Sequence, residues 1–199
     1  MGFSTLIDIV GSILIGGVLM IILWRLNDAT TQNTYNYSGE LALQQNLATT
    51  AEVIEYDFRK IGYCADWNKI PDPSKSIVFA DSNKIKFLTD IQSDGIVDTM
   101  FYYLGPASEL SQTENPRDRI LYRVVDSETP TGVNMGITQF KMVYFNALGD
   151  TISFPITKPG LIASMEINIT VENTAAYDQQ YSSAFWRQIR LVARNLRNR

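Results

Sequence analysis

The sequence predicts an α+β fold in which one long N-terminal helix packs on an antiparallel β-sheet. Three observations support this prediction. Residues 1–25 are mostly apolar, residues 43–61 place apolar side chains at helical spacing, and later segments alternate apolar and polar residues as strands do. We therefore expect three parts: a hydrophobic transmembrane helix at 1–25, its amphipathic continuation at 26–62, and an antiparallel β-domain at 63–199.

The first of these parts is long enough to cross a membrane. Residues 3–24 contain a single charged side chain, Asp8, and a bilayer core is spanned by about 20 apolar residues in a helix. Trp24 and Arg25 suit the interface at the far end. The alternative is a buried core helix of a soluble protein, but hydrophobicity on all sides of the helix favours a membrane anchor.

Asp8 is unusual in this apolar segment, because ionisable groups in membrane helices are costly and usually have a partner. The positive end of the helix dipole and the α-amino group of a neighbouring copy are two candidates. A hydrated position among lipid headgroups is the alternative. Small residues nearby would let helices approach closely, unless they are ordinary membrane-helix residues. They are Gly11, Ser12, Gly16 and Gly17.

The amphipathic continuation carries one apolar stripe, with successive spacings of four, four, three, four and three residues. This stripe predicts the helical face that packs on the sheet. Gly62 is expected as the C-cap, which ends a helix from about Phe3 to Ile61. The stripe consists of Leu43, Leu47, Ala51, Ile54, Phe58 and Ile61.

Seven segments after Gly62 have the alternation of strands, and turn residues such as Asp94-Gly95 and Pro159-Gly160 separate several of them. Strands that follow one another without helical patterns between them predict an antiparallel sheet. The expected strands are Ile77–Ala80, Lys84–Leu88, Thr99–Leu104, Arg119–Val125, Ile137–Phe145, Ile162–Val171 and Ser183–Arg194.

The composition argues against two classes of function, nucleic-acid binding and catalysis. The net charge of −4 argues against general nucleic-acid binding, which needs a cationic surface. The chain has no histidine and one cysteine, so the commonest general base and metal ligand are missing. No set of residues suggests catalysis, and we expect a protein that is not an enzyme and requires no cofactor.

One acidic loop resembles part of a calcium-binding loop, with oxygen ligands at alternating positions and a glycine at the bend. Its candidate ligand positions are Asp90, Gln92, Asp94, Ile96 and Asp98. Phe101 stands where the distal bidentate glutamate would be. The alternative to a weak Ca²⁺ site is a turn with solvated acidic side chains.

The N-terminal stretch GFSTLID before an apolar helix resembles the signature of type IV pilins and type II secretion pseudopilins. The helix end Tyr56–Tyr63 and the closing Phe185-Trp186-Arg187 resemble minor pilins of the PilW type and J-type pseudopilins. Two differences stand out. Asp8 is the sixth residue counted from Phe3, where the family has an acid at the fifth, and only Met1-Gly2 precede Phe3.

The resemblance implies a structural subunit of a pilus-like or pseudopilus filament, with the helix at 1–25 in the filament core and a slight preference for a minor or initiating subunit. Such a subunit is stored in the bacterial inner membrane and ends in a periplasmic or extracellular filament. Its partners would be the lipid bilayer, the assembly machinery of the inner membrane, and other pilin-like subunits or copies of itself. Phe3 would begin the mature chain, and Asp8 would pair with a neighbour's N-terminus. The alternative is a single-pass anchored extracytoplasmic binding domain that does not polymerise.

Overall fold

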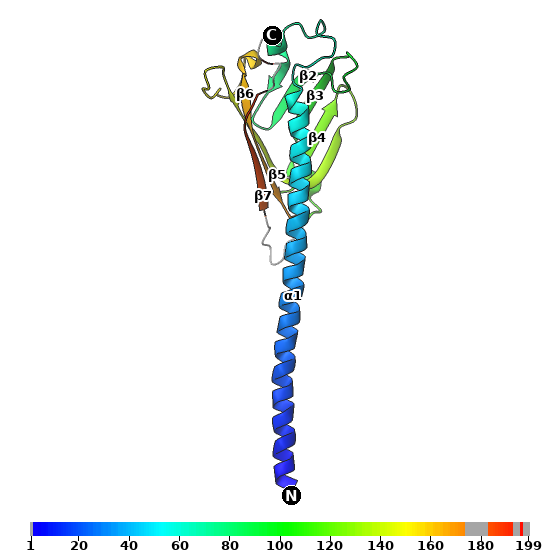
Figure 1. The fold of residues 1–199 in the computed structure, drawn as a ribbon, viewed down its shortest axis with the longest axis vertical. Coiled ribbons are helices and arrows are strands. Elements are labelled where there is room, and N and C mark those ends of the chain that lie inside the picture. Colours follow the sequence, from blue (N-terminus) through cyan, green and yellow to red (C-terminus); the bar gives the residue numbers. More distant parts are fainter. Residues whose placement is uncertain (1, 174–182, 193–195, 197–199) are drawn as a thin grey trace. The chain divides into compact units, whose positions relative to one another are not determined.

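The computed structural model describes residues 2–173, 183–192 and 196, apart from a few side chains. It confirms the α+β fold: a single long helix, α1 (Gly2–Arg59), precedes an antiparallel sheet (Figure 1). The chain forms two compact units, one up to Leu41 and one from Ala42 onward. The second unit contains the end of α1 and the whole sheet.

Helix α1 continues without a break through the polar stretch after Arg25, although asparagine and threonine are modest helix formers. Three threonine hydroxyls there donate hydrogen bonds of 2.8–2.9 Å to the carbonyl oxygens four residues earlier. These bonds satisfy the hydroxyls within the helix itself. The threonines are Thr30, Thr31 and Thr34.

The helix ends at Arg59, two residues before the expected end at Ile61, because the chain tightens into a turn. The Ile61 N–H donates to Phe58 O at 3.3 Å, and Gly62 follows with a φ of 72°. Its N–H donates to Leu88 O at 2.9 Å, which joins the end of the helix to the sheet. Gly62 suits this position because glycine adopts positive φ without steric cost.

Within the described residues, seven strands form one sheet in which each strand pairs antiparallel with the next along the chain. Three short 3₁₀ helices lie in the connections: η1 (Pro73–Lys75), η2 (Ala107–Leu110) and η3 (Pro159–Leu161). The strands are β1 (Ile77–Ala80), β2 (Lys84–Thr89), β3 (Asp98–Leu104), β4 (Arg119–Val125), β5 (Thr131–Phe145), β6 (Ser164–Glu172) and β7 (Ser183–Leu191).

Strand β5 differs most from expectation, since it begins at Thr131 rather than at Ile137. Its pairing with β4 jumps from Arg119↔Ile137 to Leu121↔Val133. Gly136 lies within this jump with a φ of 71°, and a Cβ atom there would be 2.2 Å from Glu172 O. This backbone position therefore needs glycine, and the alternation of side chains is lost around it.

Two other strand predictions were wrong at their ends. Strand β6 begins at Ser164 rather than at Ile162, and β7 is described only as far as Leu191. Ala193 and Arg194, at the end of the expected last strand, lie outside the described residues. Strands β1 to β4 differ from the expected segments by no more than one residue at either end.

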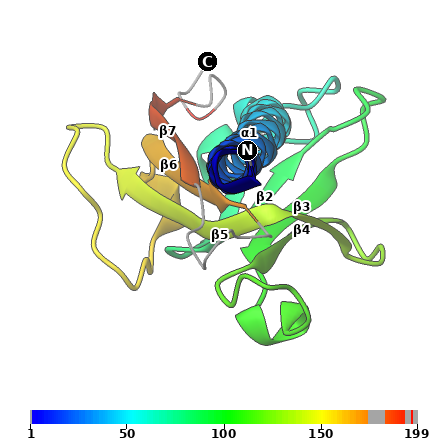
Figure 2. The same ribbon diagram turned by 90° about the horizontal axis from the view of Figure 1, so that it is seen from below.

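The sheet bends around the C-terminal part of α1 (Figure 2), and the core lies between them. All six stripe residues, from Leu43 to Ile61, are buried. Phe58 makes edge-to-face contacts with Phe87 and Tyr102, with ring centroids 5.4 and 5.3 Å apart. Burying a large apolar side chain contributes about 1.5–3 kcal/mol, so this stripe firmly holds the end of the helix on the sheet.

A buried polar contact adds to this packing. Asp57 is 2% exposed and accepts hydrogen bonds from Tyr102 Oη at 2.5 Å and from Arg123 Nε at 2.7 Å. Burial and the charge of Asp57 raise the pKa of Tyr102, so its hydroxyl remains a donor. Asp57 thus links α1 to both β3 and β4.

Candidate functional site

The apolar N-terminal part of α1 is the first candidate site. Helix α1 is long and apolar enough to span a membrane, and none of its most apolar 18-residue window, with a mean hydropathy of 2.6, is buried. Large side chains there, such as Ile13, Leu19 and Trp24, are exposed. The segment is therefore no core helix of this chain, and its composition suits a membrane anchor or a signal segment.

The assembly residues predicted in this segment have little around them. Ser12 Oγ donates to the main-chain oxygen of Asp8 at 2.7 Å. No described residue hydrogen-bonds or pairs with the Asp8 carboxylate. A Cβ atom added at Gly11, Gly16 or Gly17 would meet nothing within 4 Å. Phe3 belongs to α1, but its side chain lies outside the described part of the chain. This face of the helix is thus open to lipid or to another helix.

The acidic loop between β2 and β3 is the second candidate. Asp90 is buried, and its carboxylate accepts main-chain hydrogen bonds of 2.9–3.1 Å from Ala65, Asp94 and Gly95. Burial acts to raise the pKa of Asp90, but these N–H donors outweigh it and hold the pKa below its usual value. Asp98 accepts from the Ile91 N–H at 2.9 Å. The expectation of solvated acids was wrong for Asp90 and Asp98.

The other predicted ligand positions of this loop lie at the protein surface. Gln92, Asp94 and Ile96 are exposed, and Asp94 Oδ1 accepts from the Ile96 N–H at 2.9 Å. In the described part of the chain, no three acidic or thiol side chains gather as a metal site. Calcium binding here stays a prediction, and the hydrogen bonds to Asp90 and Asp98 account for the order of the loop without an ion.

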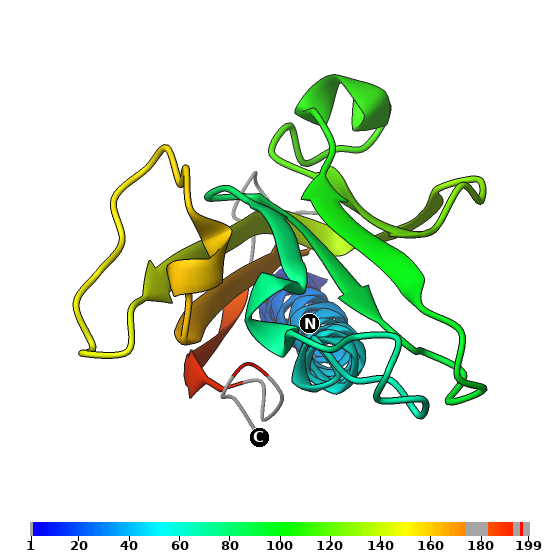
Figure 3. The ribbon, with the colours of Figure 1, turned by 90° about the horizontal axis from the view of Figure 1, so that it is seen from above.

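A polar hollow on the sheet is a third candidate, which the sequence did not indicate. It has a volume of about 510 Å³ and lies where the connection between β3 and β4 meets β5. Figure 3 shows that connection, with η2, on the side of the sheet away from the C-terminal part of α1. The lining residues are Ser82, Asn83, Leu104, Ala107, Pro116, Arg117, Arg119, Thr138, Gln139, Phe140, Lys141 and Glu172.

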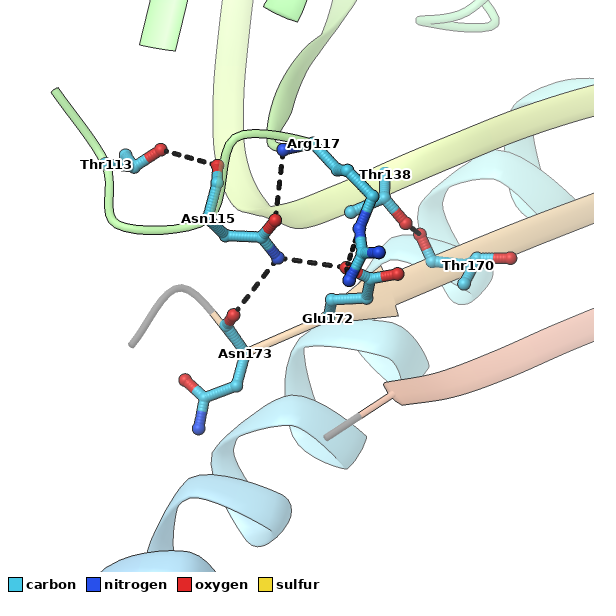
Figure 4. A network of polar contacts seen from close by, with 7 residues as sticks. All are labelled: Thr113, Asn115, Arg117, Thr138, Thr170, Glu172 and Asn173. Atoms are coloured by element: carbon cyan, nitrogen blue, oxygen red, sulfur yellow. Dashed lines mark hydrogen bonds and ion pairs between the residues drawn. The ribbon is translucent and has the colours of Figure 1, made fainter. Parts of the chain in front are cut away.

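One wall of this hollow is a hydrogen-bonded network (Figure 4). Glu172 Oε2 accepts from Arg117 Nε at 2.9 Å and from Asn115 Nδ2 at 3.0 Å, and the second Arg117 nitrogen lies 2.8 Å away. The same Asn115 amide reaches Asn173 O at 3.3 Å. Asn115 is fully buried, so this network fixes the connection between β3 and β4 against the end of β6.

Asp118 lies at the base of this connection and is also buried. Both of its carboxylate oxygens lack a close hydrogen-bond partner among the described residues. Burial, together with the charge of Glu172, raises the pKa of Asp118 above its usual value. The protonated form is thus favoured more than for an exposed aspartate.

The architecture, an apolar N-terminal helix whose end packs on an antiparallel sheet, is pilin-like. Comparisons with protein-family models, with curated proteins and with solved structures found no match.

Proposed function

We propose that this protein is a non-enzymatic structural subunit of a pilus-like or pseudopilus filament, inserted in a bacterial inner membrane before assembly. The observation that carries the proposal is the difference in burial between the two parts of α1. Its C-terminal part packs in the core of the sheet domain, whereas none of the most apolar 18-residue window in its N-terminal part is buried. An apolar helix of this kind is stable in lipid or against other apolar helices.

Asp8 would act as the assembly contact in this proposal. Its carboxylate has no partner among the described residues of its own chain, and an acidic group in an apolar environment requires one. The α-amino group of a neighbouring subunit would supply the opposite charge, and the exposed surface at Gly11, Ser12, Gly16 and Gly17 would let helices pack closely. Pairing of this kind would fix the axial position of one subunit against the next. The resemblance of the closing residues to those of minor pilins slightly favours a minor or initiating subunit.

The test is Asp8→Ala, with Asp28→Ala as the matched control for loss of one acid on the same helix. Both variants and the natural chain are followed by membrane fractionation and by immunoblot of the sheared filament fraction. We expect Asp8→Ala to insert into the membrane normally and to be reduced at least tenfold in filaments, while Asp28→Ala assembles as the natural chain does. Equal assembly of Asp8→Ala would refute the role of Asp8.

The alternative is an anchored binding domain, and the polar hollow near Arg117 is the observation that favours it. In that case the natural chain would remain in the membrane fraction under all conditions. Its absence from every sheared or periplasmic filament fraction would overturn the filament proposal.

A further inference from the structure

We propose that the hollow between the β3–β4 connection and β5 binds a compact oxyanion, a carboxylate or a phosphate, carried by a small polar molecule. The cations that would hold it are Arg119 and Lys141. This inference concerns the sheet domain alone and does not depend on whether the protein forms filaments.

The hollow lies where β5 continues beyond its last pair with β4. The pairing of these strands ends at Arg119↔Ile137, while β5 continues along β6 to Phe145. The turn between β1 and β2 closes the gap, since Ser82 O accepts from the Met142 N–H at 2.7 Å. Backbone hydrogen bonds thus frame the hollow, and its volume of about 510 Å³ is typical of sites for small ligands.

The charges in its wall are unbalanced. Three cations line it, Arg117, Arg119 and Lys141, against one acid, Glu172. Arg117 is already paired with Glu172 at 2.8 Å. Arg119 and Lys141 have no hydrogen-bond or ion-pair partner among the described residues. Two cations without a counter-charge in a concave wall attract anions.

The nearby acid Asp118 weakens this attraction less than an ordinary aspartate would. It is buried behind the wall, and its burial favours the protonated form.

The remaining lining suits the rest of a small polar ligand. A guanidinium such as that of Arg119 binds planar or tetrahedral oxyanions through parallel N–H groups. The side-chain amides of Asn83 and Gln139 offer hydrogen bonds to hydroxyl groups. A monosaccharide that carries one acidic group combines these features, so it is a suitable probe.

The test uses the full chain in detergent micelles and isothermal titration calorimetry with glucuronate, glucose 6-phosphate and glucose. We expect saturable binding of at least one of the two anions, with a Kd of order 1 mM or tighter, and none of glucose. The anion that binds more tightly identifies the carboxylate or the phosphate as the preferred group. Equal binding of glucose, or no binding of either anion, would overturn the proposal.

Two variants connect any binding to the hollow. Arg119→Gln and Lys141→Gln should each weaken anion binding about tenfold or more, because each removes one charge-assisted contact. Neither cation has a partner within the described chain, so we expect the unfolding midpoints to stay unchanged. Lys158→Gln removes an exposed cation outside the hollow and should leave binding as it is. Loss of affinity in the control alone, or in none of the three, would place the binding elsewhere.

Discussion

Removing the buried carboxylate of Asp57 should loosen the attachment of α1 to the sheet and destabilise the protein strongly. Asp57→Ala leaves the buried Tyr102 hydroxyl without its acceptor, which costs about 1–3 kcal/mol. It also removes a charge-assisted bond to Arg123, worth about 1.5–3 kcal/mol. We therefore expect a loss of about 3–5 kcal/mol in the free energy of unfolding, as found when one partner of a buried ion pair is removed.

The variant Arg123→Ala distinguishes the effect of the Asp57–Arg123 ion pair from the effect of lost packing. Arg123→Ala leaves the Asp57 carboxylate, which is 2% exposed, without its counter-charge. In Asp57→Ala the unpaired group is instead Arg123, whose side chain is 33% exposed and is therefore hydrated more easily. The double variant removes both charges and leaves no buried charge behind. Its cost should thus be smaller than the sum of the two single costs by about 2 kcal/mol or more.

The assay is urea unfolding of the full chain in detergent micelles, followed by the fluorescence of the tryptophans in the sheet domain. Glu52→Ala serves as the control, because Glu52 is exposed on the same part of α1. Costs for Asp57→Ala and Arg123→Ala that add within about 0.5 kcal/mol would refute the coupling.

Three further predictions follow from contacts in the sheet domain. Phe58→Ala should cost about 3–5 kcal/mol of unfolding free energy, and Tyr56→Ala, on the exposed side of α1, should cost less than 1 kcal/mol; similar losses would show that Phe58 is not in the core. Asp90→Ala should cost about 2–4 kcal/mol and speed hydrogen exchange at the main-chain N–H groups of residues 94 and 95, since these lose their acceptor; unchanged exchange there would contradict the hydrogen bonds of the loop. Asp118→Asn should stabilise the protein at neutral pH. Because the pKa of Asp118 is raised in the folded state, the folded protein holds a proton that the unfolded chain releases above about pH 4. The free energy of unfolding of the natural chain therefore falls as the pH rises above about 4. A gain from Asp118→Asn that is as large at pH 3 as at pH 7 would contradict this reasoning.

The periodicity of apolar residues was sufficient to predict most of the fold. The stripe from Leu43 to Ile61 identified the buried face of α1, because helical spacing places those side chains on one side. A two-residue period and the turn residues between the segments identified β1 to β4. This pattern failed at the start of β5, where Gly136 adopts positive φ and shifts the register, since a bulge interrupts the two-residue period that makes a strand recognisable.

Polar residues were harder to place from the sequence. Asp57 is not part of the apolar stripe, and its burial depends on Tyr102 and Arg123, which approach it only in the folded domain. A signal was available, since Arg123 lies on the same strand face as Leu121. Asp90 resembled a calcium ligand because alternating acids suit an ion and a hydrogen-bonded loop equally well. The hollow lined by Arg119 and Lys141 arises from separated strands and has no local pattern.

We propose that the apolar N-terminal part of α1 packs against other subunits in a filament. Copper-catalysed cross-linking of an Ile13→Cys variant tests it directly, because Ile13 is exposed on this segment and the native Cys64 is buried. We expect disulfide-linked dimers in the sheared filament fraction and monomers in the membrane fraction. Monomers alone in every fraction, from a variant that still leaves the membrane, would contradict it.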